Sequence, residues 1–454
     1  EENIPLFECP QHNFEEMYYY RWWSLRKHIK ETPVGYGMTE FLVQRSYSDK
    51  YNLIACAIGH HIYESRWLRD PKYLDQIIHT WYRGNDGGPM KKMDKFSSWN
   101  ADAVLARYMV DGDKDYLLDM KKDLETEYQR WERTNRLKNG LYWQGDVQDG
   151  MEESISGGRR KKYARPTINS YMYGNAKALS CIGILSGDEG MAMKYGMRAD
   201  TLKNLVENEL WNTRHQFFET MRTDSSANVR EAIGYIPWYF NLPDTTQKYE
   251  IAWKEIMDEK GFSAPYGLTT AERRHPEFRT RGVGKCEWDG AIWPFASAQT
   301  LTAMANFMNN YPQTVLSDSV YFRQMELYVE SQYHRGRPYI GEYLDEVTGY
   351  WLKGDQERSR YYNHSTFNDL IITGLIGLRP RLDNTIEVNP LIPADKWDWF
   401  CLDNVLYHGH NLTILWDKNG DRYHCGKGLR IFVDGKEVGQ ANTLTKIVCE
   451  NALK

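Results

Sequence analysis

Hydrophobic residues recur at helical spacing over most of the chain, up to about residue 380. Ile54, Ile58 and Ile62, for example, stand one helical turn apart and share one face of a predicted helix. Loops rich in Gly, Pro and aromatic residues separate such segments. The predicted helices span residues 14–30, 49–68, 71–82, 97–110, 114–135, 168–185, 189–211, 246–259, 294–309, 317–333 and 365–378.

Roughly a dozen helices therefore follow one another without alternating strands. Such a succession fits six helical hairpins closed into a ring, an (α/α)6 toroid in which the loops at one end line a central pocket. We predict a mainly α fold, with the (α/α)6 catalytic domain in residues 1–382.

The pattern changes near the end of the chain, where apolar and polar residues alternate in residues 384–389, 410–416 and 429–433. Alternation with a period of two is typical of half-buried strands. Turn residues at 417–420 and 434–435 separate these segments. We predict a small β-rich C-terminal domain in residues 383–454.

Aromatic residues are unusually frequent, with 16 Trp and 32 Tyr in 454 residues. Rings that carry polar handles stack on the apolar faces of sugars while their edges meet hydroxyl groups. The formal net charge of -5 gives no electrostatic reason to bind nucleic acid or an anionic membrane. We therefore expect an oligosaccharide or glycoside as partner, and no nucleic acid.

The sequence gives little indication of a metal-binding site. The seven cysteines are scattered and lack CxxC or CxxH spacing. His60 and Glu64 stand one helical turn apart, but no third ligand is in view. We expect neither a metal ion nor a cofactor.

The sequence also bears on location. No apolar run reaches the ~18 residues that a membrane-spanning helix needs, so we expect no membrane insertion. The chain begins with Glu1 and has no apolar leader segment, which is typical of a mature product after removal of an export signal. We expect a periplasmic or secreted protein.

An acidic loop stands out in residues 141–154, between two predicted helices. It holds four carboxylates, Asp146, Asp149, Glu152 and Glu153, together with two aromatic rings. Acidic groups in close proximity raise one another's pKa, so that a carboxylic acid stays protonated near neutral pH and can donate a proton.

Four further stretches, at residues 13–23, 44–46, 286–294 and 340–349, combine aromatic and charged residues in a way that a packed core does not require. Together with the acidic loop they place carboxylates on loops far apart in sequence, flanked by Arg and Trp. Glycoside hydrolysis uses such a pair, a protonated acid for the departing oxygen and an ionised carboxylate as base or nucleophile.

Short motifs connect these stretches to a known group. Residues 14–22 read FEEMYYYRW and resemble the first trehalase signature, with Arg21 where that signature has Asp. Residues 287–289 resemble the second signature, with Glu287 in place of its Gln, and Arg45 with the following Ser resembles a sugar-binding loop. The chain thus resembles the six-hairpin glycosidases of the trehalase, processing α-glucosidase and mannosylglycerate hydrolase group.

This resemblance implies catalytic residues. Glu152 falls where the group has its catalytic Asp, and Glu342 falls where it has its catalytic base. Because Glu152 is longer than Asp by a methylene, Asp149 and Glu153 remain alternatives for the acid. The resemblance implies hydrolysis of an α-linked glycoside by single displacement with inversion. The sugar-binding wall that it implies consists of Phe14, Tyr20, Arg21, Arg45, Trp288 and Asp289.

Two other functional classes fit parts of the sequence. A polysaccharide lyase on a similar toroid needs a Tyr or His base and a cation for a uronate carboxylate, and the chain has many Tyr and Arg residues. A carbohydrate-binding protein without catalysis would keep the aromatic wall alone. An unsaturated product marks the lyase, and sugar affinity that is independent of Glu152 and Glu342 marks the binding protein.

Overall fold

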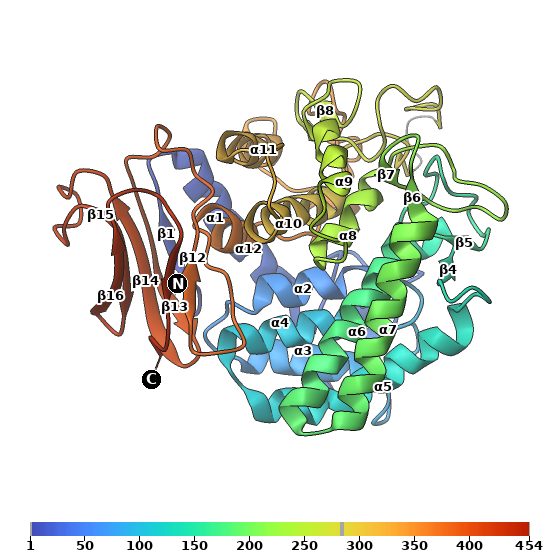
Figure 1. The fold of residues 1–454 in the computed structure, drawn as a ribbon, viewed down its shortest axis with the longest axis horizontal. Helices are drawn as coiled ribbons and strands as arrows, with labels where there is room; N and C mark the ends of the chain where they lie inside the picture. The colour runs from blue at the N-terminus through green and yellow to red at the C-terminus, as the bar shows by residue number, and fades with distance from the viewer. Residues whose placement is uncertain (1, 282–285, 454) are drawn as a thin grey trace.

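The computed structural model of the chain describes residues 2–281 and 286–453. Helices are its main regular elements, with a β-sheet on one side (Figure 1). The helices are α1 (His12–His28), α2 (Ile58–Ser65), α3 (Lys72–Arg83), α4 (Asn100–Asp111), α5 (Lys114–Asn135), α6 (Pro166–Ser186), α7 (Glu189–Leu205), α8 (Ile236–Tyr239), α9 (Gln247–Glu250), α10 (Pro294–Asn310), α11 (Asp318–Ser331) and α12 (Asn368–Leu370).

In the described part of the chain, six helices form a closed inner ring. Helix α2 packs against α4, α4 against α6, α6 against α8, α8 against α10, α10 against α12, and α12 returns to α2. Other helices cover this ring from outside, since α1 contacts α11 and α12, and α5 and α7 contact α6. The predicted (α/α)6 toroid is therefore confirmed. Because the chain returns through the outer layer, the inner helices begin at one end of the ring and finish at the other.

Three predicted helices are much shorter than the pattern suggested. In residues 246–259 only α9 is α-helical, and a 3-10 helix follows it over Ile251–Ile256. In residues 49–68 only α2 is α-helical, because Tyr51 and Asn52 adopt φ angles of 61° and 63° and break the chain into 3-10 turns. In residues 365–378 the helix α12 covers three residues and continues as a π-turn over Ile371–Leu375. In residues 49–68 and 365–378 most apolar residues are still buried, so the periodicity indicated burial rather than regular helix.

The β-rich part is a five-stranded antiparallel sheet in the order β1-β13-β14-β15-β16, with a separate pair β12-β17. The strands are β1 (Leu6–Glu8), β12 (Ile386–Val388), β13 (Trp399–Tyr407), β14 (His410–Asp417), β15 (Gly428–Val433), β16 (Lys436–Ala441) and β17 (Ile447–Cys449). The edge strand β1 comes from the start of the chain, and Leu6 pairs with Asp403. A sequence boundary near residue 382 thus stays a prediction, because the sheet takes residues from both sides of it.

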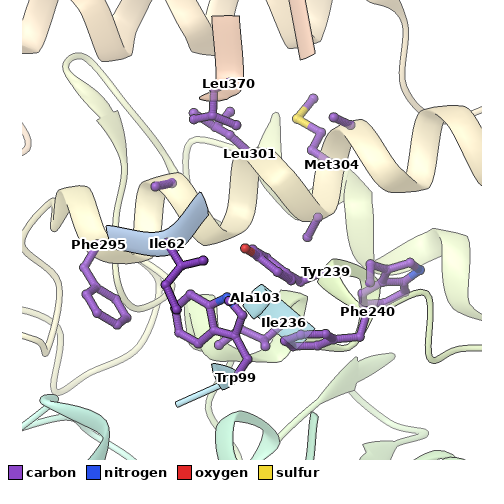
Figure 2. Packing of buried hydrophobic residues seen from close by; sticks show 14 of the residues in the cluster. Ile62, Trp99, Ala103, Ile236, Tyr239, Phe240, Phe295, Leu301, Met304 and Leu370 are labelled. Atoms are coloured by element: carbon purple, nitrogen blue, oxygen red, sulfur yellow. The ribbon is translucent and has the colours of Figure 1, made fainter. Parts of the chain in front are cut away.

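Aromatic and aliphatic side chains from the inner helices and the loops before them pack together inside the ring (Figure 2). Trp99 lies next to Tyr239, with ring centroids 5.6 Å apart, and next to Phe295 at 6.2 Å. Gly59 lets α2 approach this cluster, since an added Cβ would lie 2.3 Å from the Trp99 ring. The interior of the ring is therefore densely packed, and cavities lie toward the ends of the ring.

Within the described residues, no helix is both long enough and apolar enough to cross a membrane.

Candidate active site

A cavity of about 650 Å³ opens at the end of the ring where the inner helices begin. Its lining includes residues from the segments before α2, α4, α6, α10 and α12, which are far apart in sequence. These residues are Ile54, Cys56, Phe96, Gly150, Glu152, Trp288, Trp293 and Tyr362. The toroid thus brings loops from around the ring to one place, as the sequence predicted.

The loop that carries Glu152 turns sharply on both sides of that residue. Gly150 has a φ of +71°, and an added Cβ would lie 2.9 Å from the Cys56 sulfur. Glu153 has a φ of 73°, a conformation that residues other than Gly rarely adopt. Such conformations persist where the surroundings hold them and cluster at functional sites. The tight loop places Glu152 in the cavity lining.

The surroundings of Glu152 favour its neutral form. Burial raises the pKa of the Glu152 carboxyl above its usual range, and the charges of Asp146 and Glu342 add to the increase. The Trp288 indole N–H acts in the opposite direction. A carboxyl with a raised pKa remains protonated at higher pH, which is the property of a proton donor.

Glu342 has the opposite surroundings in the same cavity. Its Oε2 lies 2.7 Å from an Arg358 guanidinium nitrogen and 3.3 Å from Lys353 Nζ. Its main-chain carbonyl oxygen lies 3.2 Å from Nε2 of His364, which is buried. Two cations around one carboxylate compensate its negative charge, whereas Glu152 has no such ion-pair partner within the described residues.

Glu152 and Glu342 therefore converge from loops that are far apart in sequence, and each contributes to the lining of one cavity. The charge of Glu342 acts on Glu152 and raises the pKa of that carboxyl. A pair of carboxyls whose environments differ in this way can divide the roles of acid and base.

A third carboxyl, Glu40, lines the cavity and was not among the predicted site residues. It follows the hairpin of β2 (Ile29–Thr32) and β3 (Gly35–Met38), and its side chain is buried. The Tyr362 hydroxyl donates to Glu40 Oε1 over 2.7 Å. Burial raises the pKa of Glu40 to about 8, and the charges of Glu342 and Glu152 contribute.

An aromatic wall stands beside the carboxyls. The rings of Trp288 and Trp293 lie 4.4 Å apart, and Trp293 stacks on Phe295 with an angle of 9° between the planes. Trp288 also meets Tyr343 edge-on at 5.1 Å. Trp288 and Trp293 both line the cavity, so flat apolar surface and acidic groups face the same space.

Asp149, the alternative acid, does not line this cavity. Its carboxylate is paired with Arg165, and both side chains are completely buried. Arg165 also donates to Ser156 Oγ over 2.9 Å. Burial raises the pKa of Asp149, whereas Arg165 lowers it. Asp149 thus connects the acidic loop, through its ion pair, to Arg165, the residue that precedes α6.

Three of the predicted sugar-binding residues lie in α1, away from the cavity lining. Phe14 is completely buried and packs on Phe322, with ring centroids 5.9 Å apart. Tyr20 packs against the small cluster around Trp351. Arg21 is buried and donates to Gln332 Oε1 over 2.8 Å. The structure therefore uses these residues of α1 in packing.

The other three predicted sugar-binding residues lie nearer to the cavity. Trp288 is in the lining. Arg45 lies behind the lining residue Tyr47, with its guanidinium 5.5 Å from the ring centroid. Asp289 is buried and accepts a hydrogen bond from the Arg281 main-chain N–H over 2.8 Å. Glu287, where the resemblance expects Gln, is buried and pairs with Arg279.

Several lining residues went unrecognised at the sequence level. They are Glu40, Tyr47, Lys95, Phe96, Lys353 and Arg358. Lys353 and Arg358 follow Glu342 by 11 and 16 positions, and such spacing gives no signal of contact. Glu40, between Thr39 and Phe41, carried one weak signal: an acidic residue inside a short apolar stretch.

The pair considered as metal ligands has a different role. Glu64 accepts hydrogen bonds from the main-chain N–H groups of Asn368 and Asp369 over 2.9 and 3.0 Å, so it caps the start of α12. His60 packs edge-on against Trp99. Across residues 2–281 and 286–453, no group of three His, Cys, Asp or Glu side chains is arranged to hold a metal ion.

Comparison with solved structures shows the same fold in other proteins. A protein named sialidase matches with 95% identity and a TM-score of 0.99 over 99% of this chain and 42% of that one. The present chain thus spans less than half of that relative. A GH63 mannosylglycerate hydrolase from Thermus thermophilus matches with 12% identity and a TM-score of 0.59, over 77% of this chain and 98% of that one.

A third structure includes the β-rich part. The GH78 rhamnosidase of Bacillus sp. GL1 matches over 95% of this chain and 42% of that one, with 10% identity and a TM-score of 0.64. At such identities the likeness of the two hydrolases concerns the fold alone.

Two family models match the sequence itself. Residues 378–439 match the C-terminal domain of glycosyl hydrolase family 65. Residues 50–365 match the mannosylglycerate hydrolase MGH1-like glycoside hydrolase domain, which includes the loops of Glu152 and Glu342. The chain therefore belongs to the MGH1-like glycoside hydrolase family.

Proposed function

We propose that the chain hydrolyses a glycosidic bond of an oligosaccharide or glycoside bound in the 650 Å³ cavity, with Glu152 as general acid and Glu342 as general base. The observation that carries the proposal is the contrast between the two carboxyls. Burial raises the pKa of Glu152, and Arg358 and Lys353 pair with Glu342. The aromatic wall of Trp288 and Trp293 supports a sugar as the bound group.

The proposed reaction is a single displacement. Glu152 transfers its proton to the glycosidic oxygen as the bond from that oxygen to the anomeric carbon breaks. Glu342 accepts a proton from a water molecule, whose oxygen bonds to the anomeric carbon from the opposite face. The products are a sugar with inverted configuration, the released alcohol, an ionised Glu152 and a protonated Glu342. Proton exchange with solvent restores both groups.

Screening a panel of glycosides identifies the substrate. The panel includes mannosylglycerate, an α-rhamnoside and a sialoside, because the similar structures carry the names of enzymes for these sugars. Both anomers of common pentosides and hexosides complete it. Release of reducing sugar by the wild-type chain is the expected result, and an unsaturated product that absorbs in the ultraviolet would contradict hydrolysis and indicate a lyase.

The roles of the two carboxyls are tested on the best substrate of that panel. We expect Glu342→Gln and Glu152→Gln each to lower kcat by about a thousandfold or more while the thermal unfolding temperature is kept. Added azide should not restore turnover in either variant, and no glycosyl azide of retained configuration should form. NMR of the first turnovers of the wild-type chain should show the inverted anomer. Full activity of either variant would overturn its assignment, and a retained anomer would overturn the single displacement.

A further inference from the structure

The third cavity carboxyl, Glu40, has one oxygen engaged and one oxygen open. Glu40 Oε1 accepts the hydrogen bond of the Tyr362 hydroxyl. Glu40 Oε2 is buried and has no hydrogen-bond partner among the described residues. A buried polar atom without a partner carries a free-energy penalty, and in native proteins it commonly marks a place for a ligand or water. The Glu40 residue lines the same cavity as the two catalytic carboxyls, Glu152 and Glu342.

The charges around Glu40 decide its protonation state. Glu342 and Glu152 face it from two other loops, and both raise its pKa, which burial brings to about 8. The charge of Glu40 also contributes, after burial, to the raised pKa values of Tyr47 and Cys56. Near pH 7 the Glu40 carboxyl is therefore neutral and carries a proton.

The hydrogen bond from Tyr362 determines which oxygen carries that proton. Because Oε1 already accepts from Tyr362, the proton of the neutral acid belongs on Oε2. Glu40 then presents a hydroxyl donor to the cavity, in contrast with an ionised carboxylate, which only accepts. A donor in this position suits an oxygen of a bound sugar, either a hydroxyl or the ring oxygen.

We propose that Glu40 is a sugar-binding residue of the active site, which donates a hydrogen bond from Oε2 to an oxygen of the sugar held between Glu152 and Glu342. The proposal rests on the proposed function, because it takes the cavity as the sugar site. It adds a residue that recognises substrate without exchanging a proton with it. It also explains why a third acidic residue stands in a site where two carry out the chemistry.

Two substitutions separate this role from packing. Glu40→Gln keeps the shape and supplies an amide donor, whereas Glu40→Leu keeps the volume without any donor. The kinetics are measured near pH 6.5 on the panel substrate. We expect the kcat/KM of Glu40→Gln to stay within about threefold of the wild-type value. That of Glu40→Leu should fall about thirtyfold, mostly through a higher KM. Equal activity of wild type and the Leu variant, or equal loss in both variants, would overturn the proposal.

A pH series provides a second test, which holds even if the Leu variant does not fold. Calorimetric binding of the released monosaccharide to the wild-type chain should weaken as the pH rises from 6.5 to 9, because Glu40 ionises and loses its donor. In Glu40→Gln this weakening should be smaller, since Glu40 no longer titrates. An identical decline in both proteins would overturn the proposal.

The state of the free protein is tested without any substrate. With ¹³C-labelled Glu, the carboxyl signal that Glu40→Gln removes should titrate near pH 8 in the wild-type chain. A titration near the ordinary value of Glu would overturn the role of Glu40 as a neutral donor. If no glycoside of the panel is hydrolysed but this signal titrates near pH 8, the proposed function fails and the neutral state of Glu40 stands.

Discussion

The imidazole of His364 holds the main chain of Glu342, because its Nε2 lies 3.2 Å from the Glu342 carbonyl oxygen. Burial lowers the pKa of His364 well below its usual range, and His60 and Arg21 act in the same direction. The ring is therefore neutral, and since a carbonyl only accepts, the proton must be on Nε2. His364 thus positions the loop of the proposed base without touching the cavity.

Replacement of His364 by Phe should lower kcat about tenfold and leave KM within about twofold, because the donor is lost and the Glu342 loop shifts. Steady-state kinetics on the panel substrate measure both constants. His364→Gln, which retains a donor, should recover part of the loss. His79→Phe, at a partly exposed position on α3, is the control and should leave kcat unchanged. An unaltered kcat in His364→Phe would show that the Glu342 loop keeps its position without the hydrogen bond from His364.

The turn before Glu152 should not tolerate a side chain at position 150. Gly150→Ala puts a Cβ 2.9 Å from the Cys56 sulfur at a φ of +71°. Gly187→Ala has a nearly equal φ of +72° but meets nothing within 4 Å, so it measures the conformational effect alone. We expect Gly187→Ala to destabilise by about 1 kcal/mol and to keep kcat.

Gly150→Ala should destabilise more than this control and should also lower kcat, because the collision moves Glu152. Urea unfolding and kinetics provide the two readouts. If the two alanine variants behave alike in both measurements, the close approach to Cys56 does not determine the conformation of the Glu152 loop.

The buried pair of Asp149 and Arg165 should matter for stability. Asp149→Asn removes the ion-pair partner of the buried Arg165, so we expect a loss of about 3 kcal/mol in the free energy of unfolding. The control is Asp398→Asn, which breaks an exposed pair with Lys418 and should cost less than about 0.5 kcal/mol. Urea unfolding measures both. Asp149→Asn with unchanged stability and no turnover would instead make Asp149 the acid.

The stability of the protein should depend on Glu40 between pH 4.5 and pH 8. The folded pKa of about 8 lies above the ordinary value of 4.5, so in this window the folded state binds a proton that the unfolded state releases. Stability from this group is complete below the lower value and is lost as the pH rises through the upper one.

Unfolding free energies at pH 5 and pH 8 test this sign. Glu40→Gln cannot titrate, so its stability should fall less than that of the wild-type chain between the two pH values. Parallel losses in the two proteins would assign the pH dependence to other groups.

Local periodicity predicted five of the six inner helices, but α8 (Ile236–Tyr239) lies outside every predicted range. Helix α5 has the bounds that the pattern predicted, residues 114–135, because its apolar stripe is continuous. The segment before α2 looked equally helical, yet positive φ angles at Tyr51 and Asn52 break it and bring Cys56 to the cavity. Such breaks depend on tertiary packing, which single-sequence patterns do not contain.

The site could be predicted where chemistry and loop position coincide. Glu152 and Glu342 lie in acidic or aromatic loops, and both line the cavity. The family resemblance placed Arg21 in the sugar-binding wall, but helix α1 lies in the outer layer, and the Arg21 partner Gln332 is 311 positions away. Glu40 was missed because its importance comes from burial and from a neighbour, Tyr362, that is 322 positions away.

The pairing of β1 with β13 links residues near the two extremes of the chain (Figure 1). Leu6 is paired with Asp403, so this edge of the sheet cannot form until nearly all of the intervening polypeptide exists. Contacts of such long sequence separation form late, because the entropy of closing the loop must be offset first. During synthesis, β1 therefore stays without this partner until β13 has been made, and β13 follows every helix of the ring in sequence.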